Sequence, residues 1–344
     1  MRTQGVPVPH IHIAALGGTI ASTGHGAAAG VRPQVGAEEI AAAAALPTLA
    51  QAPRVTFEQI AQVSSGEIRL EDLEETVRAA RRAAAQGARA VVLTQGTDTI
   101  EETAFALALL NDSGIPIVVT GAMRGPEQPG ADGPANVRAA VIAGLDERLA
   151  DSPALVVFND EVHDPLWVRK AHTSSPAAFT SGPAAGPVGW LSEDALVLAH
   201  LPAPAARRFA VSERPAAEAP AGTTGLPRVL LVEAGVGEDF AIAPALPDAG
   251  YAGAVIAGVG GGHVRAEAAE RLGQLAATMP VVLASRTGSG RVLERTYGYP
   301  GGDIDLIARG LIPAGRLDAR KARIVLILAL GAGADPAEAL GAFG

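Results

Sequence analysis

Short apolar runs alternate with segments of helical period through the first half of the chain. Four runs are apolar almost throughout and rich in β-branched residues, namely residues 11–16, 90–93, 115–119 and 154–158. Segments that follow the helical period lie at residues 70–85, 101–110 and 136–149. Short, wholly apolar strands are typical of a parallel sheet that helices cover on both faces. The alternation therefore predicts an α/β fold whose larger, N-terminal part is a mostly parallel sheet flanked by helices.

The pattern changes after residue 160. Residues 160–211 hold proline, glycine and short apolar pieces without a helical period, so we expect hairpins and loops there. Residues 213–227 have the proline- and glycine-rich composition of an exposed connector.

Beyond the connector, strand-like and helix-like segments alternate again. The strands are expected at residues 229–232, 254–257 and 281–284, and the helices at residues 266–278, 303–309 and 319–330. The pattern predicts an N-terminal domain at residues 1–213, a linker at residues 214–227 and a smaller C-terminal α/β domain at residues 228–344.

Composition narrows the classes of function. A chain of 344 residues has room for about two domains of roughly 150 residues each. The net charge of -9 provides no basic surface, so we expect neither nucleic acid nor an anionic membrane as a partner. The absence of cysteine excludes disulfides and thiolate chemistry. His10 and His12 share one strand face, but no third ligand accompanies them, so we expect no metal and no cofactor.

The start of the chain carries no apolar signal core, and no apolar run approaches the ~18 residues of a membrane span. We therefore expect a cytoplasmic protein.

A loop with a polar residue follows the first predicted strand. Gly17 and Gly18 end the strand, and Thr19 places a hydroxyl at its carboxyl end, where open α/β sheets bind ligands. One interpretation is a tight turn capped by a hydroxyl. The other, which the loops downstream favour, makes Thr19 the nucleophile of an amide hydrolase.

A second polar loop, Thr97-Asp98-Thr99, follows the strand at residues 90–93 and opens a helix. Its unpaired first-turn amides could hold a negatively charged oxygen. The alternative is plain capping by Thr97 or Asp98, with Glu101 or Glu102 closing a capping box.

Two further polar residues are candidates for a role. Lys170 is either a solvated surface charge or, if held near Asp98 and a threonine, a group that polarises that hydroxyl. Asp132 is expected to be an ordinary N-cap with Pro134 in the first turn of its helix.

Taken together, these stretches resemble the bacterial L-asparaginase family, the threonine amidohydrolases that include glutaminase-asparaginases. The resemblance covers nearly the whole chain and is most specific in Gly96-Thr97-Asp98-Thr99 followed by two glutamates. It also rests on residues 17–22, on residues 120–124 with residues 132–134, on Lys170, and on residues 259–263, 285–286 and 321–323.

The resemblance implies that Thr19 attacks the side-chain amide carbon of L-asparagine. Thr97, Lys170 and Asp98 would form the supporting hydroxyl, amine and carboxylate. Asp98 would also bind the substrate's α-ammonium and Ser65 its α-carboxylate, with Gly96 lining the same pocket. A glycine-rich lid at about residues 23–30 would close over the substrate. The family further implies a homotetramer, built as a dimer of dimers with sites at the dimer interface.

The chain departs from the family pattern at several positions. The loop at residues 23–32 lacks the tyrosine found in many members, and His25 and Tyr297 are candidate activators of Thr19 by residue type only. Gly66 replaces a glutamine or glutamate, and His263 replaces an asparagine that reaches a neighbouring subunit. Glu294 is a candidate for a carboxylate supplied across that interface.

Two related functions share this chemistry. A glutaminase-asparaginase of broader specificity differs by one methylene in the substrate, which is worth only ~1 to 3 kcal/mol. The asparaginase-like subunit of a tRNA-dependent amidotransferase has an extra N-terminal domain, for which the residues before Thr19 leave no room.

Two other hypotheses of function do not involve amide hydrolysis. A non-catalytic asparagine-binding protein would need neither Thr19 nor Lys170. Dinucleotide binding by the glycines at residues 258–262 is rejected because His263 stands where a glycine is required.

Overall fold

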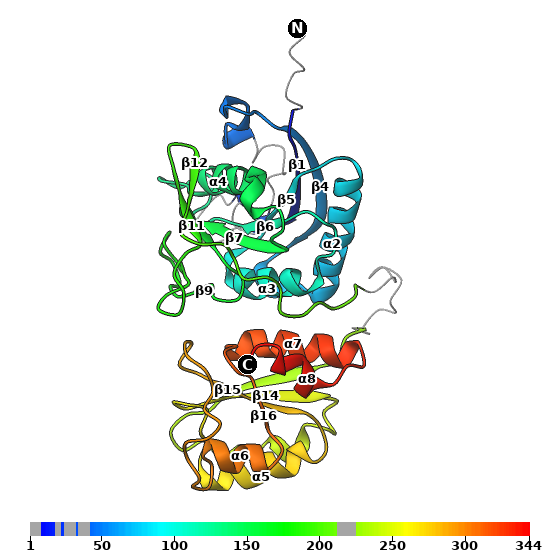
Figure 1. The fold of residues 1–344 in the computed structure, drawn as a ribbon, viewed down its shortest axis with the longest axis vertical. Helices are drawn as coiled ribbons and strands as arrows, with labels where there is room; N and C mark the ends of the chain where they lie inside the picture. The colour runs from blue at the N-terminus through cyan, green and yellow to red at the C-terminus, as the bar shows by residue number, and fades with distance from the viewer. Residues whose placement is uncertain (1–7, 18–21, 24–31, 34–41, 212–224) are drawn as a thin grey trace. The chain divides into compact units, whose positions relative to one another are not determined.

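The computed structural model describes residues 8–17, 22–23, 32–33, 42–211 and 225–344. The chain divides into two compact units, residues 1–217 and 218–344, and each is described by itself (Figure 1). Most of the predicted linker at residues 214–227 lies outside the described residues.

An eight-stranded sheet forms the centre of the larger unit, with the strand order β12-β11-β8-β7-β6-β5-β1-β4. Five strands are parallel: β1 (His10–Gly17), β4 (Arg54–Val63), β5 (Ala90–Thr94), β6 (Ile117–Thr120) and β7 (Ala154–Phe158). The other three continue the sheet in antiparallel pairing: β8 (Glu161–His163), β11 (Gly189–Ser192) and β12 (Ala195–Leu198). The predicted mostly parallel sheet is confirmed, and β4 is an addition that the apolar runs did not reveal.

Helices cover both faces of this sheet. Helices α2 (Leu70–Ala85) and α3 (Ile100–Leu110) pack on one face, and α4 (Gly133–Leu145) packs on the other (Figure 1). Alternate residues of the central strands point to opposite faces, and β5, β6 and β7 are buried at every position. The core under α4 includes Ile11, Val92, Val118, Leu155 and Val157. Burial on both faces explains why these strands are apolar without alternation.

The region after β8 consists of hairpins, as the sequence predicts. There a separate two-stranded antiparallel ribbon pairs β9 (Arg169–Lys170) with β10 (Phe179–Thr180). Another such ribbon lies near the start of the chain, where β2 (Ser22–Thr23) pairs with β3 (Arg32–Pro33).

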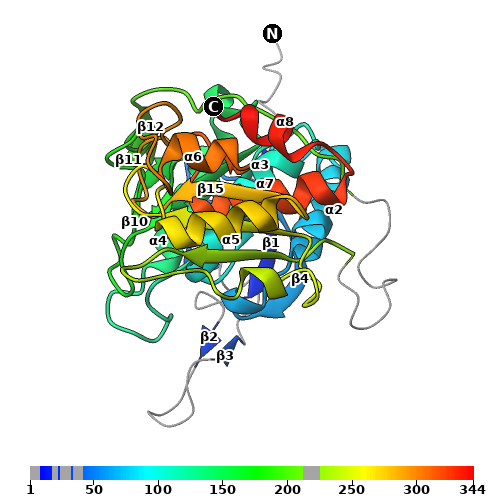
Figure 2. The ribbon, with the colours of Figure 1, turned by 90° about the horizontal axis from the view of Figure 1, so that it is seen from below.

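The smaller unit is a four-stranded parallel sheet in the order β13-β14-β15-β16. Its strands are β13 (Val229–Glu233), β14 (Gly253–Gly258), β15 (Val281–Ser285) and β16 (Ile312–Pro313). Its helices are α5 (Ala266–Ala276), α6 (Asp303–Ala308), α7 (Ala319–Gly331) and α8 (Pro336–Gly341). Helix α7 packs on one face, and α5 and α6 lie side by side on the other (Figures 1 and 2).

Both units thus have the predicted α/β architecture, and α8 and β16 were not predicted. The glycines at residues 258–262 form a tight turn closed by the pairing of Val259 with His263. Among the described residues, no helix is long and apolar enough to cross a membrane.

Candidate active site

Three neighbouring strands of the larger unit, β5, β1 and β4, end at one edge of the sheet. Gly17 is the last residue of β1 and has a φ of 104°, which favours glycine. A Cβ atom at Gly17 would lie 2.6 Å from the carbonyl oxygen of Val63, the last residue of β4. The glycine therefore lets the ends of β1 and β4 lie against each other.

The loops that follow β4 and β5 also meet. Ser65 opens a short 3-10 turn after β4, and Gly96 precedes a second such turn, Thr97–Thr99, after β5. A Cβ atom at Gly96 would lie 2.8 Å from the Cβ atom of Ser65. The Ser65 hydroxyl donates to Asp98 Oδ2 at 2.8 Å, and the Thr99 hydroxyl donates to the Ser65 carbonyl at 3.1 Å. The close approach at Gly96 makes both hydrogen bonds possible.

Lys170 reaches this pair of loops from the β9–β10 ribbon. Its Nζ atom donates to Thr97 Oγ1 at 2.8 Å and to Asp98 Oδ1 at 2.6 Å. The Lys170 side chain is 12% exposed, whereas that of Asp98 is 71% exposed. The solvated-surface alternative for Lys170 is therefore wrong: the lysine is enclosed, and its carboxylate partner faces the solvent.

The pKa of Asp98 is lowered from its ordinary value. The hydrogen bond from Lys170 is the largest cause, the hydrogen bond from Ser65 is the next, and together they outweigh the opposing effect of burial. Asp98 consequently stays ionised across the neutral range and presents a fixed, partly open negative charge. Such a group can bind a substrate ammonium.

The cluster also arranges a hydroxyl. Because the Lys170 ammonium donates to Thr97 Oγ1, the hydrogen of that hydroxyl is left to point toward another acceptor. Thr97 is 6% exposed, so this arrangement is shielded from bulk water. A hydroxyl fixed beside an ammonium can relay a proton or stabilise a developing negative oxygen.

The capping alternative fails for the loop after β5. Helix α3 has no side-chain cap, so neither Thr97 nor Asp98 closes a capping box with Glu101 or Glu102. Glu101 instead accepts a hydrogen bond from the Lys170 backbone amide.

Asp132 occupies the N-cap position of α4, as predicted, but it makes no capping bond. Its carboxylate accepts instead from the amides of Met123 and Arg124, at 3.0 and 2.8 Å. The predicted role of Asp132 is therefore wrong: the side chain holds the loop after β6 and leaves the helix end uncapped.

Several predicted residues lie outside the described part of the chain. They are Thr19, His25 and the lid at residues 23–30, of which only Thr23 is described, as part of β2.

His10 and His12 both bond the Thr56 hydroxyl, at 2.8 and 2.9 Å. Among the described residues, no group of three histidine, aspartate or glutamate side chains gathers as a metal site.

The predicted cross-subunit residues lie in the smaller unit. His263 packs edge-on against Tyr297, with ring centroids 4.9 Å apart, and its Nδ1 atom lies 3.2 Å from the Tyr299 hydroxyl. Tyr297 and Tyr299 are 42% and 49% exposed. Glu294 accepts a hydrogen bond from Arg291 at 2.6 Å. Tyr297 and Tyr299 are therefore open to solvent, whereas the His263 side chain beside them is only 13% exposed.

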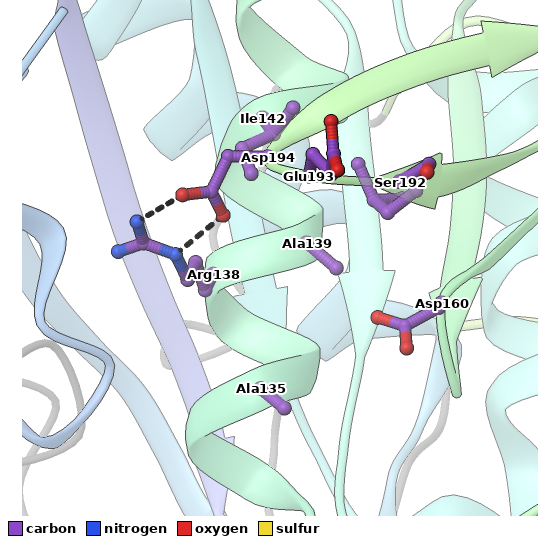
Figure 3. Close-up of a pocket in the computed structure, with 9 residues that line it drawn as sticks. Ala135, Arg138, Ala139, Ile142, Asp160, Ser192, Glu193 and Asp194 are labelled. Atoms are coloured by element: carbon purple, nitrogen blue, oxygen red, sulfur yellow. Dashed lines mark hydrogen bonds and ion pairs between the residues drawn. The ribbon is translucent and has the colours of Figure 1, made fainter. Parts of the chain in front are cut away.

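A cavity of about 360 Å³ lies between α4 and the turn that joins β11 to β12 (Figure 3). It shares no residue with the cluster formed by Ser65, Thr97, Asp98 and Lys170, which we call the Lys170 cluster. On its rim the Arg138 guanidinium binds both carboxylate oxygens of Asp194, at 2.8 and 2.6 Å, and also donates to the Ala45 carbonyl. Arg138 thus ties α4 to the β11–β12 turn and to the segment before β4.

The fold and the cluster define a two-domain α/β protein with a polar site at the carboxyl ends of its parallel strands. Comparison with known proteins is more specific: the chain belongs to the asparaginase family. The family profile "Asparaginase, N-terminal" matches residues 10–203, and "Glutaminase/Asparaginase C-terminal domain" matches residues 228–343.

Individual relatives are similar over nearly their full lengths. A "Probable L-asparaginase" of Deinococcus radiodurans is 36% identical, with 95% of each chain covered. "L-asparaginase 2" of Escherichia coli is 33% identical, with 96% of this chain and 91% of that protein covered. A crystal structure of a "Probable Cytoplasmic L-asparaginase" from Campylobacter jejuni superposes with a TM-score of 0.82 at 28% identity, covering 97% of this chain and 99% of that one.

Proposed function

We propose that this protein hydrolyses the side-chain amide of L-asparagine to L-aspartate and ammonia. The observation that carries the proposal is the position of Lys170 Nζ, within hydrogen-bond distance of both Thr97 and Asp98, in a chain of the asparaginase family. Thr19 stands two residues after Gly17, where β1 ends between β5 and β4. This position supports Thr19 as the nucleophile.

The reaction follows in two halves. The Thr19 oxygen attacks the amide carbon, the carbon–nitrogen bond breaks, and ammonia leaves with the proton taken from the threonine. Water then attacks the resulting ester, the bond to Thr19 breaks, and the proton returns to the threonine oxygen. Lys170 and Thr97 transfer the protons and stabilise the negative charge that develops on the substrate carbonyl oxygen, because they form an enclosed hydroxyl–ammonium pair.

Substrate recognition uses the same cluster. An amino acid is a zwitterion, so its site needs one fixed anion for the ammonium and neutral donors for the carboxylate. We assign the ammonium to Asp98, whose pKa is lowered by the hydrogen bonds from Lys170 and Ser65. Ser65 is assigned to the α-carboxylate: when substrate binds, its hydroxyl hydrogen turns from Asp98 Oδ2 to the substrate oxygen. Gly96 lines the same space.

Ammonia release from L-asparagine and L-glutamine tests the proposal, with wild type compared to Thr19→Ala. We expect the wild type to act on L-asparagine and the variant to lose about a thousandfold or more of that rate. A wild type that hydrolyses neither amide would favour the asparagine-binding alternative, and full turnover by Thr19→Ala would remove Thr19 from the mechanism. The ratio of the two wild-type rates decides between an asparaginase and a glutaminase-asparaginase.

Lys170→Met separates chemistry from binding. The substitution keeps the bulk of the side chain and removes the amine, so we expect the turnover number to fall about 100-fold or more. Substrate binding, measured by calorimetry, should survive because Asp98 and Ser65 remain. An unchanged turnover number would exclude Lys170 from the reaction.

We further propose a cytoplasmic homotetramer in which residues 228–344 contribute to a dimer interface and residues 214–227 link the two domains. The exposed rings of Tyr297 and Tyr299, which pack against His263, support a surface that another subunit covers. Similarity to a structure described as a cytoplasmic asparaginase supports the location. Sedimentation analysis checks the assembly, and a monomer at micromolar concentration would overturn it.

A further inference from the structure

Lys170 lies on a short element that cannot fix its position alone. Strand β9 has two residues and, within the described part of the chain, pairs with the two residues of β10 alone, apart from the eight-stranded sheet. An isolated two-stranded ribbon is marginally stable in water. The placement of the Lys170 amine to within a hydrogen bond of Thr97 and Asp98 therefore depends on contacts outside the ribbon.

Glu101 provides such a contact. Its Oε2 atom accepts a hydrogen bond from the Lys170 backbone amide at 2.8 Å. Glu101 lies in the first turn of α3, three residues after Asp98, and is 5% exposed. Lys170 is therefore fastened at both ends, by its ammonium to Thr97 and Asp98 and by its backbone to Glu101, and all three partners belong to one turn and the helix that follows it.

The burial of Glu101 gives this contact its importance. A carboxylate removed from water is costly unless its oxygens accept hydrogen bonds, so it binds a correctly placed amide strongly. The neighbouring amide of Ala171 bonds the Ala178 carbonyl across the ribbon at 2.7 Å, so it is held by the ribbon and not by Glu101.

We infer that Glu101 is a positioning residue for the reaction: its carboxylate holds the main chain of Lys170 so that the amine meets Thr97 and Asp98 in reactive geometry. The inference rests on the proposed function and deepens it. A shift of about 1 Å in a catalytic group can cost 10²-fold in rate, so loss of this bond should act on turnover more than on binding.

The test compares Glu101→Leu with Glu101→Gln. Leucine removes the acceptor at similar size, whereas glutamine keeps an amide oxygen in reach of the Lys170 amide. We expect Glu101→Leu to lower kcat by about tenfold or more with KM within about threefold, because the substrate contacts of Asp98 and Ser65 remain. We expect Glu101→Gln to recover kcat to within about threefold of wild type. A folded Glu101→Leu with wild-type kcat, or a Glu101→Gln as slow as the leucine variant, would overturn the assignment.

Hydrogen exchange of the Lys170 amide gives a readout that needs no activity. Exchange should accelerate in Glu101→Leu and stay slow in Glu101→Gln, while the Ala171 amide stays protected in both. If the wild type hydrolyses no amide but the Lys170 amide behaves this way, the proposed function is wrong and the positioning contact is right. If the Lys170 amide exchanges equally in all three proteins, the positioning contact is wrong whatever the activity.

Glu74→Met serves as the matched control. Glu74 is a buried glutamate on α2 that pairs with Arg78 of the same helix, so its loss tests the general effect of removing a buried helical carboxylate. We expect kcat of the folded Glu74→Met protein to stay within about threefold of wild type. A tenfold loss in this control as well would assign the effect of Glu101→Leu to stability and overturn the inference.

Discussion

The buried histidine of β8 should make the larger unit sensitive to acid. His163 is fully buried, and its Nδ1 atom lies 2.9 Å from the Ser181 hydroxyl. Its Nε2 atom has no hydrogen-bond partner among the residues that the structure describes. Burial lowers its pKa from 6.5 to about 4. In the unfolded chain the imidazole takes up a proton near pH 6.5, whereas in the folded protein it resists protonation until near pH 4. The stability that depends on neutral His163 is therefore present above pH 6.5 and is lost as the pH falls toward 4.

The two pKa values set the size of the effect. Proton linkage between them gives a loss of about 2 kcal/mol in the free energy of unfolding between pH 7 and pH 4.5. Glu161, whose Oε2 atom lies 3.5 Å from His163 Nε2, acts in the opposite direction. Burial raises its pKa, so its protonated form favours folding as the pH falls. The test variant His163→Gln and the control His200→Gln both keep Glu161. The difference in pH dependence between His163→Gln and wild type therefore comes from His163.

Urea unfolding at pH 7 and pH 4.5 measures this loss in wild type and in His163→Gln. Both tryptophans, Trp167 and Trp190, lie in the larger unit, so their fluorescence reports on that unit alone. The glutamine does not titrate, and its pH dependence should be about 2 kcal/mol smaller than that of wild type. His200→Gln, at an exposed position, should keep the wild-type pH dependence. Equal pH dependence in wild type and His163→Gln would refute the reasoning.

One glycine, Gly96, and one carboxylate, Asp303, give two further predictions. Gly96→Ala should raise KM for L-asparagine about tenfold, because its Cβ would displace Ser65 from Asp98. The control is Gly235→Ala, where a Cβ meets nothing within 4 Å. An unchanged KM for Gly96→Ala in ammonia-release assays would contradict the assignment of Ser65. Asp303→Asn should destabilise the smaller unit by about 1 to 3 kcal/mol, since the buried carboxylate accepts two backbone amides at 2.8 Å; hydrogen exchange of those amides checks this, and unaltered protection would contradict it.

The buried strands and amphipathic helices of this fold could be predicted from the sequence because each carries its own signal. Residues 70–85 have a helical period with acids early and arginines late, and α2 spans the same residues. Strand β4 was missed for the opposite reason. It lies at the edge of the sheet, half exposed, and alternates apolar with polar residues such as Thr56 and Glu58. The alternation is itself a strand signal, but it differs from the wholly apolar runs on which the strand prediction was based.

The candidate site was only partly predictable, since its geometry depends on contacts between distant segments. Position at a strand end marked Thr97 and Asp98 as candidates. For Lys170 the residues alone left two interpretations open, and the family resemblance favoured the functional one. The distance of 2.6 Å between Lys170 and Asp98 joins residues 72 positions apart, which no local pattern contains. Asp132 shows the converse: its place before a helix predicted a cap, but a nearby loop offered two amides, and tertiary contacts outweighed the local preference.

Gly17 and Gly96 explain how the ends of three strands and the loops after them can lie so close together. Without a side chain at Gly17, β1 lies against the end of β4, and without one at Gly96 the loop after β5 lies against Ser65. Both contacts are shorter than a Cβ atom permits, so the spacing of the three strand ends is set by backbone packing. The loop after β1 carries the proposed nucleophile, and it starts from the fixed point at Gly17. The position of the proposed site is therefore determined first by the packing of the sheet edge, where Gly17 and Gly96 let the strand ends and loops meet, and Lys170 with Thr97 and Asp98 completes it.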